Sequence, residues 1–288
     1  MKNLPASIRQ RLLNLARETG RTNNELVQHF AMCRFLKRLS LTDYADRFIL
    51  KGAMLLHALK LTQARTTLDI DLLGMVNNDE STIRTVIETA IVADVEPDGL
   101  EFDKSSIVIS AITHAADYEG RRANFRAKLE KIKIALQIDI GFGDRVIPSP
   151  RHIELPTLLG FPPGKMRAYL PENSIAEKAH AIVSHGSLNS RMKDYFDIWL
   201  LKHSLNLDEK ILKEAMAATF NARGTTIPNE SVIFSREYLK DTAKQVQWAA
   251  FIRKRAIKQA PASFQEVGTE VHEYLIALFV EAGLIRKP

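Results

Sequence analysis

The sequence predicts an α+β protein in which a small mixed sheet with helices is followed by a mostly helical C-terminal part. Between residues 48 and 145, strand-like and helix-like patterns alternate, whereas beyond residue 171 apolar residues recur at helical spacing. We therefore expect an N-terminal helical segment over 1–47, a mixed core over 48–150 and a mostly helical domain over 151–288.

The composition is that of an ordinary globular protein, with 45% hydrophobic and 26% charged residues. No apolar run approaches the roughly 18 residues of a membrane span, and the N-terminus lacks the apolar core of a secretory signal. The single cysteine, Cys33, excludes an internal disulfide and fits a reducing cytoplasm. We interpret it as a small core residue and not as a nucleophile.

Positive charge is concentrated in three stretches. Lys and Arg outnumber acidic residues by nine to four in 1–47, by six to one in 120–134 and by eight to three in 223–258. Each stretch carries +5, so within a net charge of +6 the rest of the chain carries −9. Such asymmetry suits a polyanionic partner drawn toward an acidic, metal-loaded centre. Ordinary solvated helix faces are the alternative.

The first two helices are expected over 7–19 and 23–39, on either side of a break at Gly20. Thr22 or Asn23 would cap the second helix, because short polar side chains accept hydrogen bonds from the first free N–H groups. A helix-turn-helix DNA-binding motif is an alternative interpretation, although two helices with a short turn occur in many folds.

The core opens with residues 48–54, which read FILKGAM, an apolar strand-like run interrupted by Gly52. Leu55, Leu56 and Leu59 then follow at helical spacing. A glycine at a strand-to-helix turn lets a phosphate approach the backbone and the unpaired N–H groups of the helix start.

Residues 67–73 read TLDIDLL, the most informative segment of the chain. In a strand, Leu68, Ile70 and Leu72 would point into a core while Asp69 and Asp71 point together to the other face. Adjacent like charges are costly unless a cation lies between them, and carboxylate oxygens suit Mg²⁺. A solvated edge strand with two surface acids is the alternative.

A third acid lies on the most regular strand pattern. Residues 131–142 alternate so that isoleucine, leucine and phenylalanine share one face and Asp139 stands on the polar face. A helix over 80–93 and strands over 106–112 and 124–129 precede it. The loop GFGD at 141–144 closes a strand instead of opening a helix, so we interpret it as a turn and not as a dinucleotide fingerprint.

The second half begins with an extended, proline-rich connection over 148–163. Apolar spacing then predicts a series of helices, and Asp208 is the expected N-cap of the third. Their expected ranges are 172–185, 191–203, 208–222, 234–258 and 262–282.

One lysine and two aspartates break the helical pattern. Lys178 lies between Ile175 and Ile182 on the apolar stripe, so it must extend to solvent or meet an anion, either a triphosphate or a carboxylate. Asp194 and Asp197 share a face of the next helix and could orient Lys178 or receive a proton. The alternative is one helix-start acid and one surface acid.

Five motifs, in this order, resemble one family. They are KGAML at 51–55, TLDIDLL at 67–73, QIDIGFGD at 137–144, IAEK at 175–178 and RMKDYFD at 191–197. Together they are similar to the AbiEii/AbiGii nucleotidyltransferase toxins, a group that includes the MenT toxins of mycobacteria. The resemblance spans roughly residues 5–205.

The resemblance implies a polymerase-β-like nucleotidyltransferase fold with its core in 48–150, and a role in a toxin–antitoxin pair or in phage defence. It makes Asp69 and Asp71 the metal-binding acids and Asp139 a third acid of that set. It makes Lys178 the lysine that contacts nucleotide phosphate, with Asp194 or Asp197 as the following motif acid. The remaining nucleotide-binding positions that it implies are Lys51, Gly52, Ala53 and Thr67.

The chain departs from the superfamily at Ala53, where a serine usually follows the glycine. Without the hydroxyl, one hydrogen bond to the nucleotide is lost, worth about 0.5–1.5 kcal/mol. Backbone N–H groups can still bind phosphate there.

The expected reaction is transfer of a nucleotide monophosphate from an NTP to an RNA acceptor, the tRNA 3′ end, which would block translation and growth. Mg²⁺ or Mn²⁺ would be the cofactor and the NTP the co-substrate. The expected partners are the tRNA acceptor stem and a cognate antitoxin from a neighbouring gene, in the cytoplasm and without a membrane. Two alternatives stay open: the same chemistry on a protein hydroxyl or a small molecule such as an aminoglycoside, and a non-catalytic nucleic-acid-binding regulator.

Overall fold

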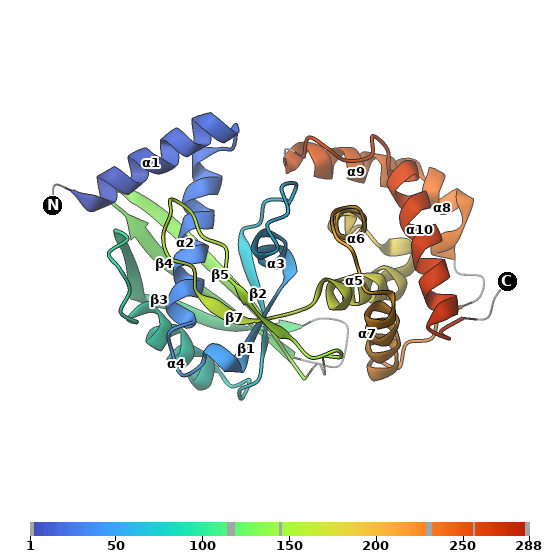
Figure 1. Cartoon of the computed structure of the whole chain (residues 1–288), viewed down its shortest axis with the longest axis horizontal. Helices are drawn as coiled ribbons and strands as arrows, with labels where there is room; N and C mark the ends of the chain where they lie inside the picture. Colours follow the sequence, from blue (N-terminus) through green and yellow to red (C-terminus); the bar gives the residue numbers. More distant parts are fainter. Residues whose placement is uncertain (1–2, 114–118, 144–145, 229–231, 256, 286–288) are drawn as a thin grey trace. The chain divides into compact units, whose positions relative to one another are not determined.

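The computed structural model describes residues 3–113, 119–143, 146–228, 232–255 and 257–285. The chain forms two compact units (Figure 1). The first unit comprises Met1–Lys60, Thr66–Asp144 and Arg151–Ala168, and the second comprises Leu61–Arg65, Arg145–Pro150 and Tyr169–Pro288. The α+β class that the sequence predicts is confirmed, since a mixed sheet occupies the first unit and helices make up most of the second.

The first unit is built on a seven-stranded sheet with the order β3-β4-β5-β2-β1-β7-β6. The pairs β2/β5 and β1/β7 are parallel and the other neighbours are antiparallel. The alternating isoleucine and leucine side chains of β5 are buried from Ile134 to Ile140, as the pattern predicts. The strands are β1 (Phe48–Lys51), β2 (Asp69–Gly74), β3 (Leu100–Thr113), β4 (Glu119–Leu129), β5 (Ile132–Phe142), β6 (Arg151–Glu154) and β7 (Lys165–Ala168).

Among the described residues, five helical segments belong to this unit, and α2 is packed against β5 and α4. Phe35 of α2 meets Phe102 and Phe125 of the sheet at ring-centroid distances of 6.5 and 5.2 Å. Thr22 is the N-cap of α2 and accepts the N–H of Glu25 at 3.2 Å. The segments are α1 (Leu4–Thr19), α2 (Asn23–Leu39), η1 (Ala45–Arg47), α3 (Gly52–Ala58) and α4 (Glu80–Ile91).

The burial of α2 argues against the helix-turn-helix interpretation. Every residue from Leu26 to Leu39 is buried or half-buried. A recognition helix has to present a solvent-exposed face to the major groove. The residues of α2 are instead packed into the core of the unit, so no such face is available over 26–39.

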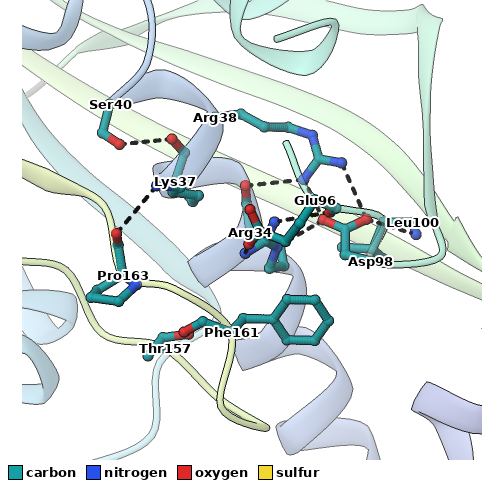
Figure 2. A network of polar contacts seen from close by, with 10 residues as sticks. All are labelled: Arg34, Lys37, Arg38, Ser40, Glu96, Asp98, Leu100, Thr157, Phe161 and Pro163. Carbon is teal, nitrogen blue, oxygen red and sulfur yellow. Dashed lines mark hydrogen bonds and ion pairs between the residues drawn. The ribbon is translucent and has the colours of Figure 1, made fainter. Parts of the chain in front are cut away.

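Two arginines of α2 are held by one carboxylate (Figure 2). Arg34 Nε donates to Asp98 at 2.7 Å, and Arg38 donates to both Asp98 oxygens at 2.5 and 3.1 Å. Burial by itself would raise the pKa of Asp98, but Arg38 and Arg34 outweigh it and lower that pKa. Arg34 also lies over the ring of Phe161, 4.7 Å from its centroid. This paired network fixes α2 against the segments that follow α4 and precede β7.

The second unit is helical, with α5 in contact with α6 and α7, and α10 in contact with α6, α7, α8 and α9. Asp208 caps α7 as predicted, accepting the N–H of Ile211 at 3.1 Å. The helices are α5 (Pro171–His185), η2 (Gly186–Leu188), α6 (Met192–Ser204), α7 (Glu209–Ala222), η3 (Val232–Phe234), α8 (Arg236–Lys240), α9 (Thr242–Lys254) and α10 (Phe264–Glu281).

Two expectations about elements are wrong. The single helix expected over 234–258 is divided between η3, α8 and α9, because the Asp241 side chain accepts the N–H groups of Ala243 and Lys244 and starts a new helix. Leu68 precedes β2 and is 61% exposed instead of lying in the core. The connection over 148–163 is extended as expected, and part of it, β6, pairs with β7 in the sheet.

Cys33 is buried and is not paired with another cysteine. Burial raises the pKa of its thiol to about 12, so it behaves as the core residue that the sequence predicts.

Two of the expectations fall partly outside the described residues. Asp144, at the end of the GFGD loop, is one such residue, and residue 256 of the helix expected over 234–258 is another. Within the part of the chain that the structure describes, no helix is both long and apolar enough to span a membrane.

Candidate active site

Four charged residues form a row across four neighbouring strands of the sheet. Arg122 of β4 is paired in register with Asp139 of β5, Asp139 with Asp71 of β2, and Asp71 with Lys51 of β1. Residues paired in register place their side chains on the same face of a sheet. The charges therefore run positive, negative, negative, positive along this row.

Asp69 joins the two central acids from the same face of β2. Asp69, Asp71 and Asp139 each offer a carboxylate oxygen, and these three atoms lie within 4.8 Å of one another. The opposite face of the same strands is apolar, with Ile70 and Ile138 fully buried. The structure thus brings the three acids together, each on the polar face that the alternation of its strand predicts.

Neighbouring side chains hold these carboxylates. Arg122 donates from Nε and from a terminal nitrogen to the two oxygens of Asp139, each at 2.7 Å, and Gln137 lies 3.3 Å from both oxygens. The Thr67 hydroxyl donates to Asp69. The hydrogen bond to Asp139 raises the pKa of Arg122, and the charges of Asp69 and Asp71 add to this effect.

Gly52 is required where the strand β1 turns into α3. Its φ of +66° is a conformation that side-chain-bearing residues rarely adopt. A Cβ on Gly52 would lie 1.9 Å from Oδ2 of Asp71. The glycine backbone therefore occupies the space directly beside the acid. Ala53, the next residue, is fully buried.

The three carboxylates fit a divalent cation. They supply hard oxygen donors that converge on one point, which is what Mg²⁺ or Mn²⁺ prefers. All three residues are half-buried, so a cation there would be reachable from solvent while lying partly within the protein.

A second cluster lies within the second unit, around Lys178 of α5. Its side chain is 12% exposed, and Nζ lies 2.7 Å from Asp197 and 3.4 Å from Asp194 of α6. Arg65 donates to both oxygens of Asp197 at 2.9 and 3.1 Å, and Arg191 donates to Asp194 at 2.5 Å. The three cations and two carboxylates leave this cluster a net charge of +1.

The cluster answers the two questions that the sequence raised about these residues. The anion that Lys178 meets is a pair of carboxylates, and both aspartates are fully buried, so the interpretation of one of them as a surface acid is wrong. Burial alone would raise the pKa of Asp197, but Arg65 and Lys178 hold it at about 2. Burial would likewise raise the pKa of Asp194, and Lys178 and Arg191 lower it. Both stay ionised at neutral pH and are therefore poor proton acceptors.

Sequence reasoning missed the arginines of both clusters. Arg122 could have been found from the hairpin, because a turn at 130–131 places it opposite Asp139. Arg191 stands in the motif RMKDYFD but was given no role. Arg65 carried no local signal, since its partner Asp197 is 132 residues away along the chain.

The comparisons with known proteins agree with this architecture. A family model described as nucleotidyl transferase AbiEii toxin, type IV toxin–antitoxin system, matches residues 34–270. The chain belongs to this family of nucleotidyltransferase toxins. A search of the curated proteins finds no match.

Two solved structures from Helicobacter pylori have a similar fold. One, called JHP933, is 16% identical with a TM-score of 0.53, and the match covers 91% of this chain and 94% of that one. The other, described as a candidate nucleotidyltransferase, is 16% identical with a TM-score of 0.54, covering 93% of this chain and 100% of that one. At this identity the likeness is one of fold.

Proposed function

We propose that this protein transfers a nucleotide monophosphate from an NTP to the 3′ end of tRNA, with Mg²⁺ or Mn²⁺ bound by Asp69, Asp71 and Asp139. The tRNA 3′-hydroxyl oxygen would form a bond to the α-phosphorus, the α–β phosphoanhydride bond would break, and pyrophosphate would leave. The observation that carries the proposal is the convergence of these three carboxylates within 4.8 Å in a chain of the AbiEii family. A blocked tRNA end would stop translation and growth, which is the effect expected of a toxin.

The first unit supplies the reacting centre in this proposal. A bound divalent cation would stabilise charge on the attacking and leaving oxygens. Asp139 assists deprotonation of the attacking hydroxyl. Gly52 and Ala53 bring backbone N–H groups toward the triphosphate, Lys51 adds a positive charge beside Asp71, and Thr67 holds Asp69 through its hydroxyl.

In the second unit, Lys178 would bind a phosphate oxygen of the nucleotide. An ammonium group has three N–H donors, and Asp194 and Asp197 accept two of them. The aspartates therefore hold the ammonium in place and leave one donor for the ligand. Asp197, with the shorter contact to Lys178 and two bonds from Arg65, is the residue that we assign as the motif acid.

A strip of basic residues supports an RNA acceptor. Arg126 and Lys128 follow Arg122 on the same face of β4, and Lys133 of β5 is paired with Lys128. All three are exposed, and they extend from the acids toward the β4–β5 turn. Glu101 and Asp103 of β3 flank them and leave the five residues at +1. Sequence-independent attraction of backbone phosphates to such a strip would position the RNA end.

The decisive experiment incubates the full-length protein with each labelled NTP and total tRNA, and measures the mass of the tRNA afterwards. We expect the added mass of one or more nucleotides in wild type and none in Asp69→Asn or Asp71→Asn. Label in protein or in an aminoglycoside, with unlabelled tRNA, would assign the chemistry to another acceptor. Wild type that binds NTP but labels no acceptor would contradict the proposal.

The proposal also predicts where the enzyme acts and which protein would inhibit it. A tRNA substrate places the enzyme in the cytoplasm, and a growth-arresting toxin needs a cognate antitoxin, which we expect from a neighbouring gene. Co-expression with that gene should restore growth.

A further inference from the structure

Arg122 occupies both oxygens of an acid that the proposed function assigns to the metal. Its two N–H groups form parallel 2.7 Å bonds to Asp139, the strong two-pronged geometry of arginine with a carboxylate. Its charge is also felt by Asp69 and Asp71. The guanidinium is therefore part of the acid cluster and not a distant surface cation.

Whether Arg122 stays beside the three acids depends on which other charges are bound there. Three carboxylates within 4.8 Å repel one another, and a guanidinium beside them relieves that repulsion. A divalent cation at the same acids would meet the positive charge of Arg122 at close range. A triphosphate, with about four negative charges, would accommodate both cations.

We infer that Arg122 couples metal loading to nucleotide binding: it holds Asp139 when no metal is bound and moves to the polyphosphate when metal and nucleotide arrive together. The inference rests on the proposed function and deepens it, because it makes the metal site weak until the nucleotide is present. By thermodynamic reciprocity, the metal then raises nucleotide affinity by the same factor.

The surroundings of Arg122 allow such a movement. Its side chain is 39% exposed, and the strand β4 that carries it is paired on both edges. The backbone is thus fixed while the long side chain can reorient. Arg65, by contrast, binds Asp197 with the same two-pronged geometry but is 6% exposed and has no room to turn toward a ligand.

The test measures Mn²⁺ binding to the full-length protein by calorimetry, first without nucleotide. We expect Arg122→Gln to bind Mn²⁺ more tightly than wild type, by a factor on the order of ten, because a competing positive charge is gone. Arg122→Lys keeps the charge but loses the two-pronged geometry, so its affinity should lie between the two. Arg121→Gln is the matched control, since that arginine is next in the strand and bonds the backbone oxygen of Asn78.

The second measurement repeats the titration with non-hydrolysable α,β-methylene analogues of the four NTPs, each alone. The nucleotide should raise Mn²⁺ affinity by a larger factor in wild type than in Arg122→Gln. Equal or weaker Mn²⁺ binding by Arg122→Gln without nucleotide, while wild type binds Mn²⁺ and Asp69→Asn does not, would overturn the inference and leave the proposed function standing. Wild type that binds no Mn²⁺ with or without nucleotide would overturn both.

Discussion

At the scale of single residues, Gly52 shows how closely the backbone is packed against the acids. The structure leaves no space for a Cβ there, since it would lie 1.9 Å from Oδ2 of Asp71. Gly52→Ala should therefore displace that carboxylate and reduce Mn²⁺ affinity and nucleotidyl transfer at least tenfold. Calorimetry and the tRNA mass assay measure the two effects.

The control for this substitution is Gly160→Ala in the same unit. Gly160 has a φ of +74°, but a Cβ added to it would meet nothing within 4 Å, so the variant suffers backbone strain of about 1–2 kcal/mol without a clash. It should lose stability and keep its affinity for Mn²⁺. Equal affinity for Mn²⁺ in both variants would show that Asp71 tolerates the added carbon.

Asp197 should make the second unit sensitive to acid. Its folded pKa of about 2 lies below the ordinary 3.8, so its contribution to stability is present above pH 3.8 and lost as the pH falls through 2. Between pH 7 and pH 3 the loss is about 1 kcal/mol. Asp197→Asn should cost about 3–5 kcal/mol at pH 7, because it breaks a buried ion pair. The difference in the free energy of unfolding between wild type and Asp197→Asn should be smaller at pH 3 than at pH 7.

Urea unfolding followed by tryptophan fluorescence measures this effect in the right unit, because both tryptophans, Trp199 and Trp248, belong to the second one. Glu270→Gln is the control: it removes a half-exposed carboxylate that contacts Lys202 and His203, and it should cost about 0–1 kcal/mol. A gap between wild type and Asp197→Asn that stays constant or widens in acid would count against the assignment.

The sequence predicted the acidic residues better than their basic partners. Strand alternation was enough to place Asp69, Asp71 and Asp139 on polar faces, and helical phase was enough to place Lys178 on an apolar one. The roles of Arg65 and Arg122 were not predicted, because a basic residue on a loop or an exposed strand looks like an ordinary surface residue until its acidic partner is known.

At the scale of elements, the hairpin β4–β5 both completes the acid cluster and presents the basic strip. Replacing Arg126, Lys128 and Lys133 by glutamine should weaken tRNA binding for all sequences alike. The slope of log affinity against log salt should fall by about 2–3, since each phosphate contact releases about one counterion. Filter binding at salt concentrations between 50 and 200 mM measures this slope.

A charge-matched variant distinguishes the strip from net charge. Replacing Lys202, Lys210 and Lys213 by glutamine should leave the slope of log affinity against log salt unchanged. These lysines lie in the second unit, outside the three basic stretches. The same loss of slope in both triple variants would mean that the protein attracts RNA through its overall charge.

Three details of the fold were not predicted from the sequence, each for its own physical reason. The break at Asp241 depends on a side chain capping a new helix, and aspartate is also acceptable within a helix pattern, so periodicity did not reveal it. Strand β6 is four residues long, too short to establish a period, and only its pairing with β7 defines it. Leu68 lies one residue before β2 and so falls outside the alternation.

At the scale of the whole molecule, the AbiEii family membership predicts toxicity. Induced expression of wild type should arrest growth. Lys178→Ala should relieve the arrest because, in the proposed function, Lys178 is the cation that binds the nucleotide phosphate. Growth curves and colony counts measure this, with soluble protein levels checked in parallel. Lys202→Ala, which removes a partly exposed lysine of the same unit, should remain toxic.

Two outcomes would contradict the toxin assignment. Growth that continues at high levels of soluble wild type would do so directly. Arrest by Asp69→Asn and Lys178→Ala as severe as that by wild type would instead mean that binding, and not transfer, stops growth.

The sequence by itself determined the α+β class, the apolar backing of the acids and the anomaly of a lysine on a buried stripe, because side-chain periodicity is a local property of the chain. The tertiary structure decided which charges meet, although the β4–β5 hairpin alone could have indicated the pair of Arg122 and Asp139. Strand register sets Arg122 against Asp139, and folding sets Arg65 and Lys178 against Asp197. Coulomb attraction acts over a few ångströms of space, and the distance along the chain between these partners gives no measure of it.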